Sequence, residues 1–504
     1  MCYLVLAMAS LSQPPRVTAT LAGGRRTGAS PELVLAIVCA GVVLASLDLF
    51  IVNVALPQIG KDFDLPPGSL GDLSWVLNAY TIVYAAFLVL FGRLSERFRR
   101  ERAFLLGVAT FVAASAACAA ATSLPMLVGF RVAQAAGAAL LTPTSLGLIL
   151  ATWPPERRHG AVRTWTAVGG LAAAAGPVVG GLLVALSWRW VFLVNVPVGL
   201  LALFVGWRML PNVPGHPVSA PDALGAVLIT GGVGALVLGL VEGGSWGWGS
   251  GRTVLALTGA IVALALFGLR NARHPSPLID RSLFTLRPVI GASTVALFFM
   301  ASFGGMLLSR VLWAQDVWHW SALSTGLGIA PGPIMVPLFS FLVAGRLIAR
   351  IGAARVIAIG SGVFAAGAVW WALAMGLTPD YAGDMLGGML LTGIGVGLTL
   401  PTFMATGAAA LPQHSFATGS AAINMLRQIG LAIGVALLIA VLGSPHSPAA
   451  TLHVYERASY VIAALAVVAG AFGLLLLASR DGAKPAARPA PAVVASEVVA
   501  NEPV

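Results

Sequence analysis

The sequence predicts an all-α integral membrane protein, and three observations predict it: composition, the length of the apolar segments, and loop charge. Charged side chains make up 9% of the 504 residues and hydrophobic ones 58%, whereas an ordinary soluble domain carries about 25% charged residues. Mean hydropathy is +0.92. A soluble fold of this size would need more polar surface than this chain supplies. The composition therefore argues against a soluble enzyme.

The net charge of +11 does not indicate a nucleic-acid partner. The arginines lie in short clusters between apolar segments and do not form one basic face. Lysine occurs only at Lys61 and Lys484, and this preference for arginine is typical of a GC-rich bacterial genome. No His, Cys, Asp and Glu cluster has metal-ligand spacing, and no phosphate-binding loop follows a strand, so neither a metal nor another cofactor is expected.

Apolar segments long enough to cross a bilayer recur along the chain. A membrane helix needs about 20 mostly apolar residues, and backbone groups in lipid must pair internally, which favours helices. The sequence predicts fourteen spans, at 33–56, 73–92, 103–122, 125–149, 162–186, 190–210, 222–242, 253–270, 288–310, 323–346, 355–376, 384–410, 417–442 and 457–478.

The basic residues are divided unevenly between alternate loops. One set of loops holds the arginine clusters at 93–102, 157–163, 270–287 and 346–355, whereas the other holds only Lys61, Arg189, Arg252, Arg310 and Arg457. Cytoplasmic loops are enriched in Lys and Arg. The distribution therefore predicts a multi-pass protein of the bacterial inner (plasma) membrane with both termini in the cytoplasm.

An internal repeat indicates how the spans are grouped. The segment that begins Gly92-Arg93-Leu94 returns as Gly345-Arg346-Leu347, at an offset of 253 residues. Two further glycine patterns, 137–144 against 395–402 and 176–180 against 430–434, repeat at offsets of 258 and 254 residues. Repeats of this kind build many secondary transporters, with the substrate site between the two halves.

The repeat predicts five parts of the chain. Residues 31–210 and 288–478 are two six-helix bundles, and 211–287 is a two-helix insert with a cytoplasmic linker. Residues 1–30 are expected to form a disordered cytoplasmic arm, and the Ala/Pro-rich tail at 479–504 is also expected to be disordered.

Five segments carry motifs that together resemble those of the major facilitator superfamily, in particular its fourteen-span drug:proton antiporter branch. They are Leu47–Pro57 in span 1, Gly92–Arg102 between spans 2 and 3, Arg131–Gln134 in span 4, Gly176–Gly181 in span 5 and Trp188–Gly199 at the entry to span 6. The resemblance covers about residues 33–478. The loop motif departs from the family pattern, which has Asp at Glu96 and Gly at Arg99.

The resemblance implies the fold and the activity. It implies two six-helix bundles that alternate access to a shared cavity and export lipophilic drugs or antibiotics in exchange for protons. Such a protein is not an enzyme, binds lipid and its substrate but no nucleic acid, and is expected to be monomeric. Two alternatives are proton-coupled or facilitative transport of another metabolite, and a membrane-embedded transferase, for which no catalytic constellation is convincing.

Three charged residues are candidates for proton coupling. Asp48 lies inside an apolar span, where a carboxylate costs about 2.5–3.5 kcal/mol on insertion scales and needs a partner, water or a proton. Arg131 in span 4 lies at a similar depth and could stabilise the Asp48 charge. A structural ion pair that only orients helices is the alternative. Glu242, at the end of span 7, is a weaker candidate.

Two further groups of residues are assigned by the motifs. The resemblance implies that charges of the repeated loop hold one conformation closed, although topology alone would also place arginines there. These candidates are Gly92, Arg93, Glu96, Arg97, Gly345 and Arg350. In the span-5 motif, small residues let helices approach closely and the proline bends the helix. These residues are Gly176, Pro177, Gly180 and Gly181.

Polar and aromatic residues within the spans are candidates for the lining of a substrate cavity, although they could equally be packed core or face lipid. They are Asn53, Asn78, Tyr80, Gln134, Phe298, Phe299, Met306, Asn424 and Arg427.

Overall fold

A computed structural model describes residues 30–66, 69–214, 222–411, 416–443, 445 and 447–477. Within these ranges the chain forms helices and no strand. The expected disordered arm, apart from Ser30, and the expected disordered tail lie outside the described residues.

The described residues contain fourteen helices that are long and apolar enough to cross a membrane. Each overlaps one predicted span, including the short ones at 190–210 and 253–270. The spans are formed by α2 (Pro31–Asp62), α3 (Leu70–Arg97), α4 (Arg100–Ala119), α5 (Leu124–Thr152), α6 (Arg158–Val184), α7 and α8 (Trp190–Leu193 and Asn195–Met209), α9 (Ala223–Trp246), α10 (Gly251–Arg273), α11 with the π-helical turn η3 (Arg287–Leu312 and Trp313–Val317), α12 to α14 (Ala322–Ile329, Pro331–Phe339 and Gly345–Ile351), α15 (Ala353–Ala374), the π-helical turn η5 with α16 (Tyr381–Leu386 and Gly387–Ala409), α17 (Phe416–Leu442) and α18 (Pro448–Leu477).

The tenth span is the most irregular. It is divided into α12, α13, a π-helical turn at Ser340–Ala344 and α14. Pro331 begins α13 and Pro337 lies inside it. Each proline lacks an N–H group and disturbs the regular i to i−4 pattern, so these residues explain why the span is interrupted.

The helices pack as an N-terminal group (α2–α8) and a C-terminal group (α11–α18). In the first, α2 packs on α6, α4 packs on α5 and α8, and α3 packs on α5. In the second, α11 packs on α17 and α18, and α15 packs on α16 and α18. The groups meet mainly where α3 contacts α17 and where α6 contacts α12.

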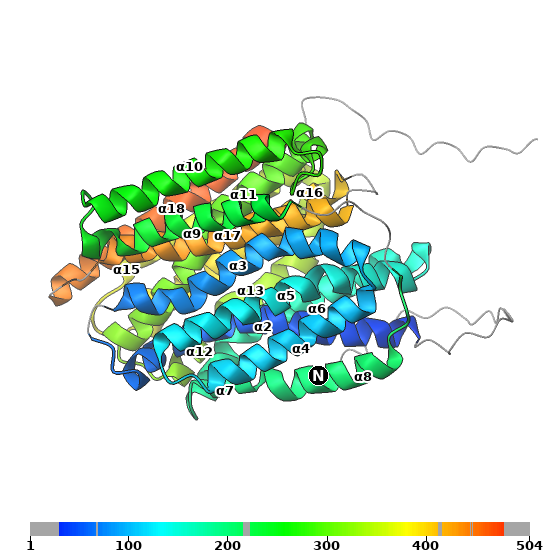
Figure 1. Ribbon diagram of the computed structural model, residues 1–504. Helices are drawn as coiled ribbons and strands as arrows, with labels where there is room; N and C mark the ends of the chain where they lie inside the picture. Colours follow the sequence, from blue (N-terminus) through cyan, green and yellow to red (C-terminus); the bar gives the residue numbers. More distant parts are fainter. Residues whose placement is uncertain are drawn as a thin grey trace, which may run out of the picture.

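The seventh and eighth spans lie outside this interface. Helices α9 and α10 pack side by side on one flank of the bundle, and α9 also contacts α3 and α17 (Figure 1). The α10 helix exposes Leu255, Ile261 and Val262. In a protein of fourteen apolar helices, such a surface is suited to contact with lipid.

The two ends of the bundle differ in charge: one is rich in arginine and the other is poor in it. The arginine-rich end carries the connection between α3 and α4, beside Arg97, Arg99 and Arg100. The arginine-poor end carries the connection between α2 and α3, after Lys61.

Candidate functional site

A buried ion pair joins the middle of α2 to α5. Asp48 and Arg131 are each 0% exposed, and the Arg131 guanidinium donates to the Asp48 carboxylate. Removing one partner of a buried pair leaves an uncompensated charge, which costs about 3–5 kcal/mol. The pairing of these two candidate residues therefore makes each depend on the other.

Two amides complete the surroundings of the carboxylate. Gln134 Nε2 donates to Asp48 Oδ1 over 2.8 Å, and Asn195 Nδ2 of α8 donates to the same oxygen over 3.1 Å. Gln134 Oε1 accepts from Arg131 over 2.6 Å, and Gln134 Nε2 also donates to Ser115 Oγ of α4 over 2.8 Å. Hydrogen bonds of this kind stabilise the charged form of the pair.

The guanidinium is also held by α3. Arg131 Nε donates to the carbonyl of Val76 over 3.0 Å. The Tyr80 ring centroid lies 4.1 Å from the guanidinium carbon, within the range of a cation–π interaction. The Tyr80 hydroxyl is buried and has no hydrogen-bond partner among the described residues. Five helices of the N-terminal group, α2, α3, α4, α5 and α8, thus meet at one charged cluster.

Close packing of α4 on α5 brings Ser115 to the cluster. A Cβ atom on Gly137 would lie 2.6 Å from the backbone nitrogen of Phe111, a separation that no side chain tolerates. The absence of a side chain at Gly137 lets the two helices approach, and Ser115 follows one turn after Phe111.

Sequence reasoning proposed Asp48 and Arg131 as a pair. It proposed Gln134 and Tyr80 as lining of a substrate cavity, whereas the structure buries both against the pair and outside the lining of the cavity between the groups. It missed Ser115 and Asn195. Asn195 is part of the segment 188–199 that carries a family motif, so a signal for it was present. Ser115 is a common residue in an apolar span, and only the packing reveals it.

A small cavity separates the two groups beside this cluster. Its volume is about 20 Å³, roughly the space that one water molecule needs. All the polar lining comes from the N-terminal group, at Asn53, Asn78, Thr81 and Arg131, and that group also contributes apolar residues. The C-terminal group contributes apolar lining only, at Gly304, Leu307, Leu431 and Val435. Arg131 therefore borders both the Asp48 carboxylate and the space between the groups.

The candidate aromatic residues of α11 lie elsewhere. Phe298 stacks on Phe472 of α18, with ring centroids 5.5 Å apart, and the buried Phe299 packs edge-on against Phe364. Met306 is buried in the core. The aromatic contact between the groups comes instead from Phe50 and Phe303, whose centroids are 5.8 Å apart.

Polar residues of α17 face α3 nearer the arginine-rich end. Arg427 Nε and both polar atoms of the Gln428 side chain are buried and lack a hydrogen-bond partner among the described residues. Arg427 lies close enough to Tyr84 for an electrostatic interaction, and the Tyr84 and Thr142 hydroxyls share a hydrogen bond of 2.9 Å. Asn424 donates to the carbonyl of Ser420 over 3.0 Å. Buried polar groups without partners are uncommon and need an explanation such as a ligand or water.

The glycines of the span-5 motif permit close contact on two sides of α6. A Cβ atom on Gly176 would lie 2.8 Å from Phe50 Cβ, and one on Gly180 would lie 2.9 Å from the carbonyl of Ile51. On Gly181 it would lie 2.6 Å from the carbonyl of Ala322 in the C-terminal group. Pro177 lies inside α6, and its carbonyl approaches Gly326 of α12. The motif thus lets α6 pack closely on α2 within its own group and on α12 of the C-terminal group.

The repeated loop motifs have different surroundings. Gly92 lies between Pro143 and Ala421, since a Cβ atom there would be 3.8 Å and 3.9 Å from their Cβ atoms. Gly345, by contrast, has open space around it, and Arg350 lies in α14, which has no buried residue. Gly92 is therefore close to both groups, whereas Gly345 is not.

At the connection between α3 and α4, the acid that forms an ion pair is Glu101, which sequence reasoning did not select. Arg93 lies within α3 and Arg97 is its last residue, while the Glu96 side chain lies outside the described part of the structure. Glu101 is buried, accepts from Arg99 Nε over 2.6 Å and accepts from the Val213 amide over 2.9 Å. It thereby ties the α3–α4 connection to the segment that follows α8.

Glu242 lies near the end of α9 at the arginine-poor end. Its carboxylate accepts from Ser245 over 2.8 Å and lies beside Gly71 at the start of α3. Among the described residues, no hydrogen bond or ion pair connects Glu242 to the Asp48 cluster.

Comparison with known proteins agrees with this architecture. The family model described as "Major Facilitator Superfamily" matches residues 38–435. The chain is 34% identical over 434 residues to the tetracenomycin C resistance and export protein of Streptomyces glaucescens, covering 86% of this chain and 78% of that protein. It is 32% identical over 467 residues to the methylenomycin A resistance protein of Bacillus subtilis (strain 168), covering 90% of this chain and 96% of that protein.

Solved structures show the same fold. An auto-inhibited peptide transporter of the POT family superposes with a TM-score of 0.67 at 17% identity, over 91% of this chain and 99% of that one. The family match and the relatives named for resistance and export, together with fourteen membrane-length helices among the described residues, make this a multi-pass membrane transporter and not an enzyme. The chain belongs to the major facilitator superfamily.

Proposed function

We propose that this transporter exports lipophilic drugs or antibiotics in exchange for protons, and that Asp48 is the group that carries the proton. The observation that supports this most directly is the buried Asp48–Arg131 pair beside the cavity between the groups. The resistance and export proteins among its relatives support the direction and the substrate class.

The proposed coupling follows from the position of Arg131. When Asp48 is ionised, its charge compensates the guanidinium, and the adjacent cavity is close to neutral. Protonation of Asp48 removes that compensation, so the cavity acquires an excess positive charge. A bound lipophilic cation is then repelled, and the guanidinium favours water in the cavity. Proton and substrate therefore compete without binding the same atom.

The two groups of helices would act as the moving bodies. Residues 31–210 and 288–478 form the proposed bundles, and residues 211–287 form the insert and linker. The close contacts of Gly181 and Gly326 between α6 and α12 would close the arginine-poor end, and separation there would open it. Alternating access between such bundles is the common mechanism of this kind of transporter.

The arginine-rich end would face the cytoplasm, so that both chain termini lie inside an inner (plasma) membrane. Protons then enter from the arginine-poor end. At about 150 mV one proton releases about 3.5 kcal/mol, enough to support a substrate ratio of roughly a few hundred. No described group of three or more His, Cys, Asp or Glu could hold a metal ion, and the proposed cycle needs neither a cofactor nor a second copy of the chain.

The test is export by purified protein in proteoliposomes under an imposed pH gradient. Tetracenomycin C, methylenomycin A and the fluorescent cation ethidium would serve as substrates, with a pH-sensitive dye to record proton movement. We expect gradient-driven export by the natural chain and none by Asp48→Asn. The matched control is Asp62→Asn, which removes an acid paired with Arg189 at the exposed arginine-poor end.

Two results would reject the proposal. One is Asp48→Asn with export still driven by the pH gradient, and the other is export by the natural chain that ignores the gradient. Gradient-driven transport of small metabolites with no transport of the three test substrates would favour a metabolite transporter instead.

A further inference from the structure

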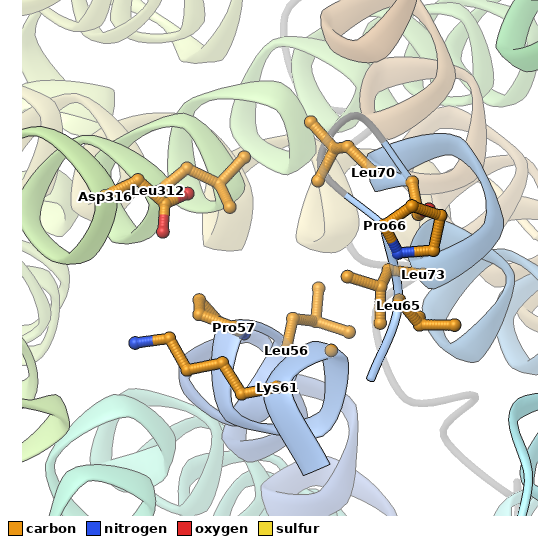
Figure 2. Close-up of a pocket in the computed structure, with 11 residues that line it drawn as sticks. Leu56, Pro57, Lys61, Leu65, Pro66, Leu70, Leu73, Leu312 and Asp316 are labelled. Carbon is orange, nitrogen blue, oxygen red and sulfur yellow. The ribbon is translucent and has the colours of Figure 1, made fainter. Parts of the chain in front are cut away.

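A second, larger cavity lies between the two groups at the arginine-poor end. Its volume is about 230 Å³. The N-terminal group lines it with the end of α2, the connection and the start of α3, and the C-terminal group lines it with the end of α11 and the turn η3 (Figure 2). Most of the lining is apolar, from residues such as Leu56, Leu73 and Leu312. Because both groups form its walls, its shape must change whenever the groups separate.

Two lining residues carry charge, and they belong to different groups. Lys61 comes from the last turn of α2, and Asp316 comes from η3. Figure 2 shows the ammonium and the carboxylate on opposite sides of the opening, with both side chains reaching into the same space. Both residues are exposed and belong to the lining of the cavity. They are therefore the only pair of opposite charges that face each other across this part of the described interface.

Neither charge forms an ion pair or a side-chain hydrogen bond with any described residue, and in this structure they do not form one with each other. The other three acids of the C-terminal group are engaged: Asp380 and Asp384 accept from backbone amides, and Glu456 pairs with His453. Asp316 is thus the acid of this group that remains available for a partner in the other group.

The groups that surround Asp316 are few. Lys61 approaches from α2, His319 from the turn after η3, and Tyr455 from α18. Arg310, of α11, is near Tyr455 but is buried in the C-terminal group, where its guanidinium contacts Ser309, Ser459 and Met375. Among these cations, Lys61 alone moves with the N-terminal group.

We propose that Lys61 and Asp316 form an electrostatic latch that holds the arginine-poor mouth of the transporter closed. The two charges attract across the cavity and resist separation of the helix groups there. Nearby, Gln315 of η3 donates to the carbonyl of Val54 over 3.1 Å, so the latch acts beside a contact that already joins the groups. Lys61 and Asp316 are positioning residues: they set the fraction of time for which the mouth is open and do not bind the substrate.

The latch concerns the conformation of the transporter and adds a device to the proposed export cycle. Its test can therefore omit substrate and any proton gradient, so its failure is distinct from a failure of the proposed function. Spin labels would be placed at the exposed positions Ala120→Cys and Ser321→Cys, one in each group at the arginine-poor end, after replacement of the native cysteines. Pulsed electron resonance then measures the distribution of distances between the labels in nanodiscs.

We expect Lys61→Gln and Asp316→Asn each to raise the ratio of long to short distances about fivefold, equivalent to about 1 kcal/mol. The exchange Lys61→Asp with Asp316→Lys restores the natural distribution because the attraction is the same with the signs reversed. High salt raises the long-distance fraction in the natural chain but not in either single variant. Asp72→Asn, which removes an exposed acid at the same end outside the cavity lining, is the matched control and leaves the distribution unchanged.

Two results would overturn the latch. Single variants with the natural distribution of distances would show that the charges do not hold the mouth closed. An exchange variant that is at least as open as the single variants would show that each side chain acts separately and not through mutual attraction. Loss of ethidium binding in Asp316→Asn, with unchanged distances, would also reject the latch and assign the carboxylate to substrate recognition.

Discussion

The two groups of helices each bury an arginine, but in opposite electrostatic settings. Arg131 of the N-terminal group has Asp48, two carbonyl acceptors and an aromatic face around it. Arg310 of the C-terminal group contacts two hydroxyls, the Met375 sulfur and the Trp371 ring, and it forms no ion pair with a described residue. Among the described residues, a buried ion pair therefore occurs in the N-terminal group and not in the C-terminal group.

The sequence positions explain the difference. At the repeat offset of 253 residues, Asp48 corresponds to Ala301, and at the offset of 258 residues Arg131 corresponds to Met389. The C-terminal group therefore has apolar residues where the N-terminal group has its pair. This asymmetry teaches that similar backbone packing in two halves does not give them the same role, and it supports assigning proton coupling to the N-terminal group.

The largest expected effect is a difference in stability between two variants, in which one or the other buried arginine is replaced by methionine. Arg131→Met leaves the Asp48 carboxylate without its partner, and we expect a loss of stability of about 3–5 kcal/mol. Arg310→Met removes a buried charge that has no acidic partner, and we expect stability that is unchanged or higher. The apparent melting temperature of the purified protein measures both.

The double variant Asp48→Asn with Arg131→Met controls for the orphaned charge. It should recover part of the stability that Arg131→Met loses, because neither charge then remains buried. Equal destabilisation by Arg131→Met and Arg310→Met would contradict the electrostatic contrast between the groups.

A smaller effect is expected where the two groups touch. Gly181→Ala places a Cβ atom 2.6 Å from the carbonyl of Ala322, so α6 and α12 must move apart. Transport should slow severalfold, with the mouth at the arginine-poor end more often open in the label distances described above. Gly268→Ala is the control, since nothing lies within 4 Å of its Cβ position. Similar transport by both variants would argue that this contact has no part in the cycle.

The smallest effect is expected at the insert, which neither group contains. Burial would raise the pKa of Asp222, but the Gly225 amide and the Arg270 guanidinium outweigh it and lower that pKa below its usual range. The side chain also caps the start of α9. Asn caps a helix as well as Asp does, so Asp222→Asn keeps the cap and removes only the charge that pairs with Arg270. It should reduce stability by about 1 kcal/mol at neutral pH, the upper range for a partly exposed ion pair.

The sign of the pH dependence follows from the lowered pKa. The contribution of Asp222 is present above the pKa of the unfolded chain and is lost as pH falls through the lower pKa of the folded state. Melting temperatures of the natural chain and Asp222→Asn should therefore converge in acid. A difference that persists at low pH would indicate that the carboxylate charge is not the cause.

Local sequence patterns were sufficient to predict the membrane spans and the family. An apolar stretch of membrane length forms a helix whatever surrounds it, because unpaired backbone groups are too costly in lipid. For the same reason Asp48 stands out in its span, and its partner Arg131 could be inferred because two unpaired charges are costly at the same depth. The motifs of the superfamily are likewise contiguous and need no knowledge of packing.

Other features required the three-dimensional arrangement. Ser115 and Asn195 reach Asp48 because α4 and α8 happen to cross there, and Phe298 stacks within the C-terminal group although its sequence surroundings resemble those of a cavity residue. Lys61 and Asp316 are 255 positions apart in the chain and face each other only after both groups are assembled. Contacts between helices depend on how far each one is rotated and how closely it packs, and a membrane span constrains neither because nearly all of its residues are apolar.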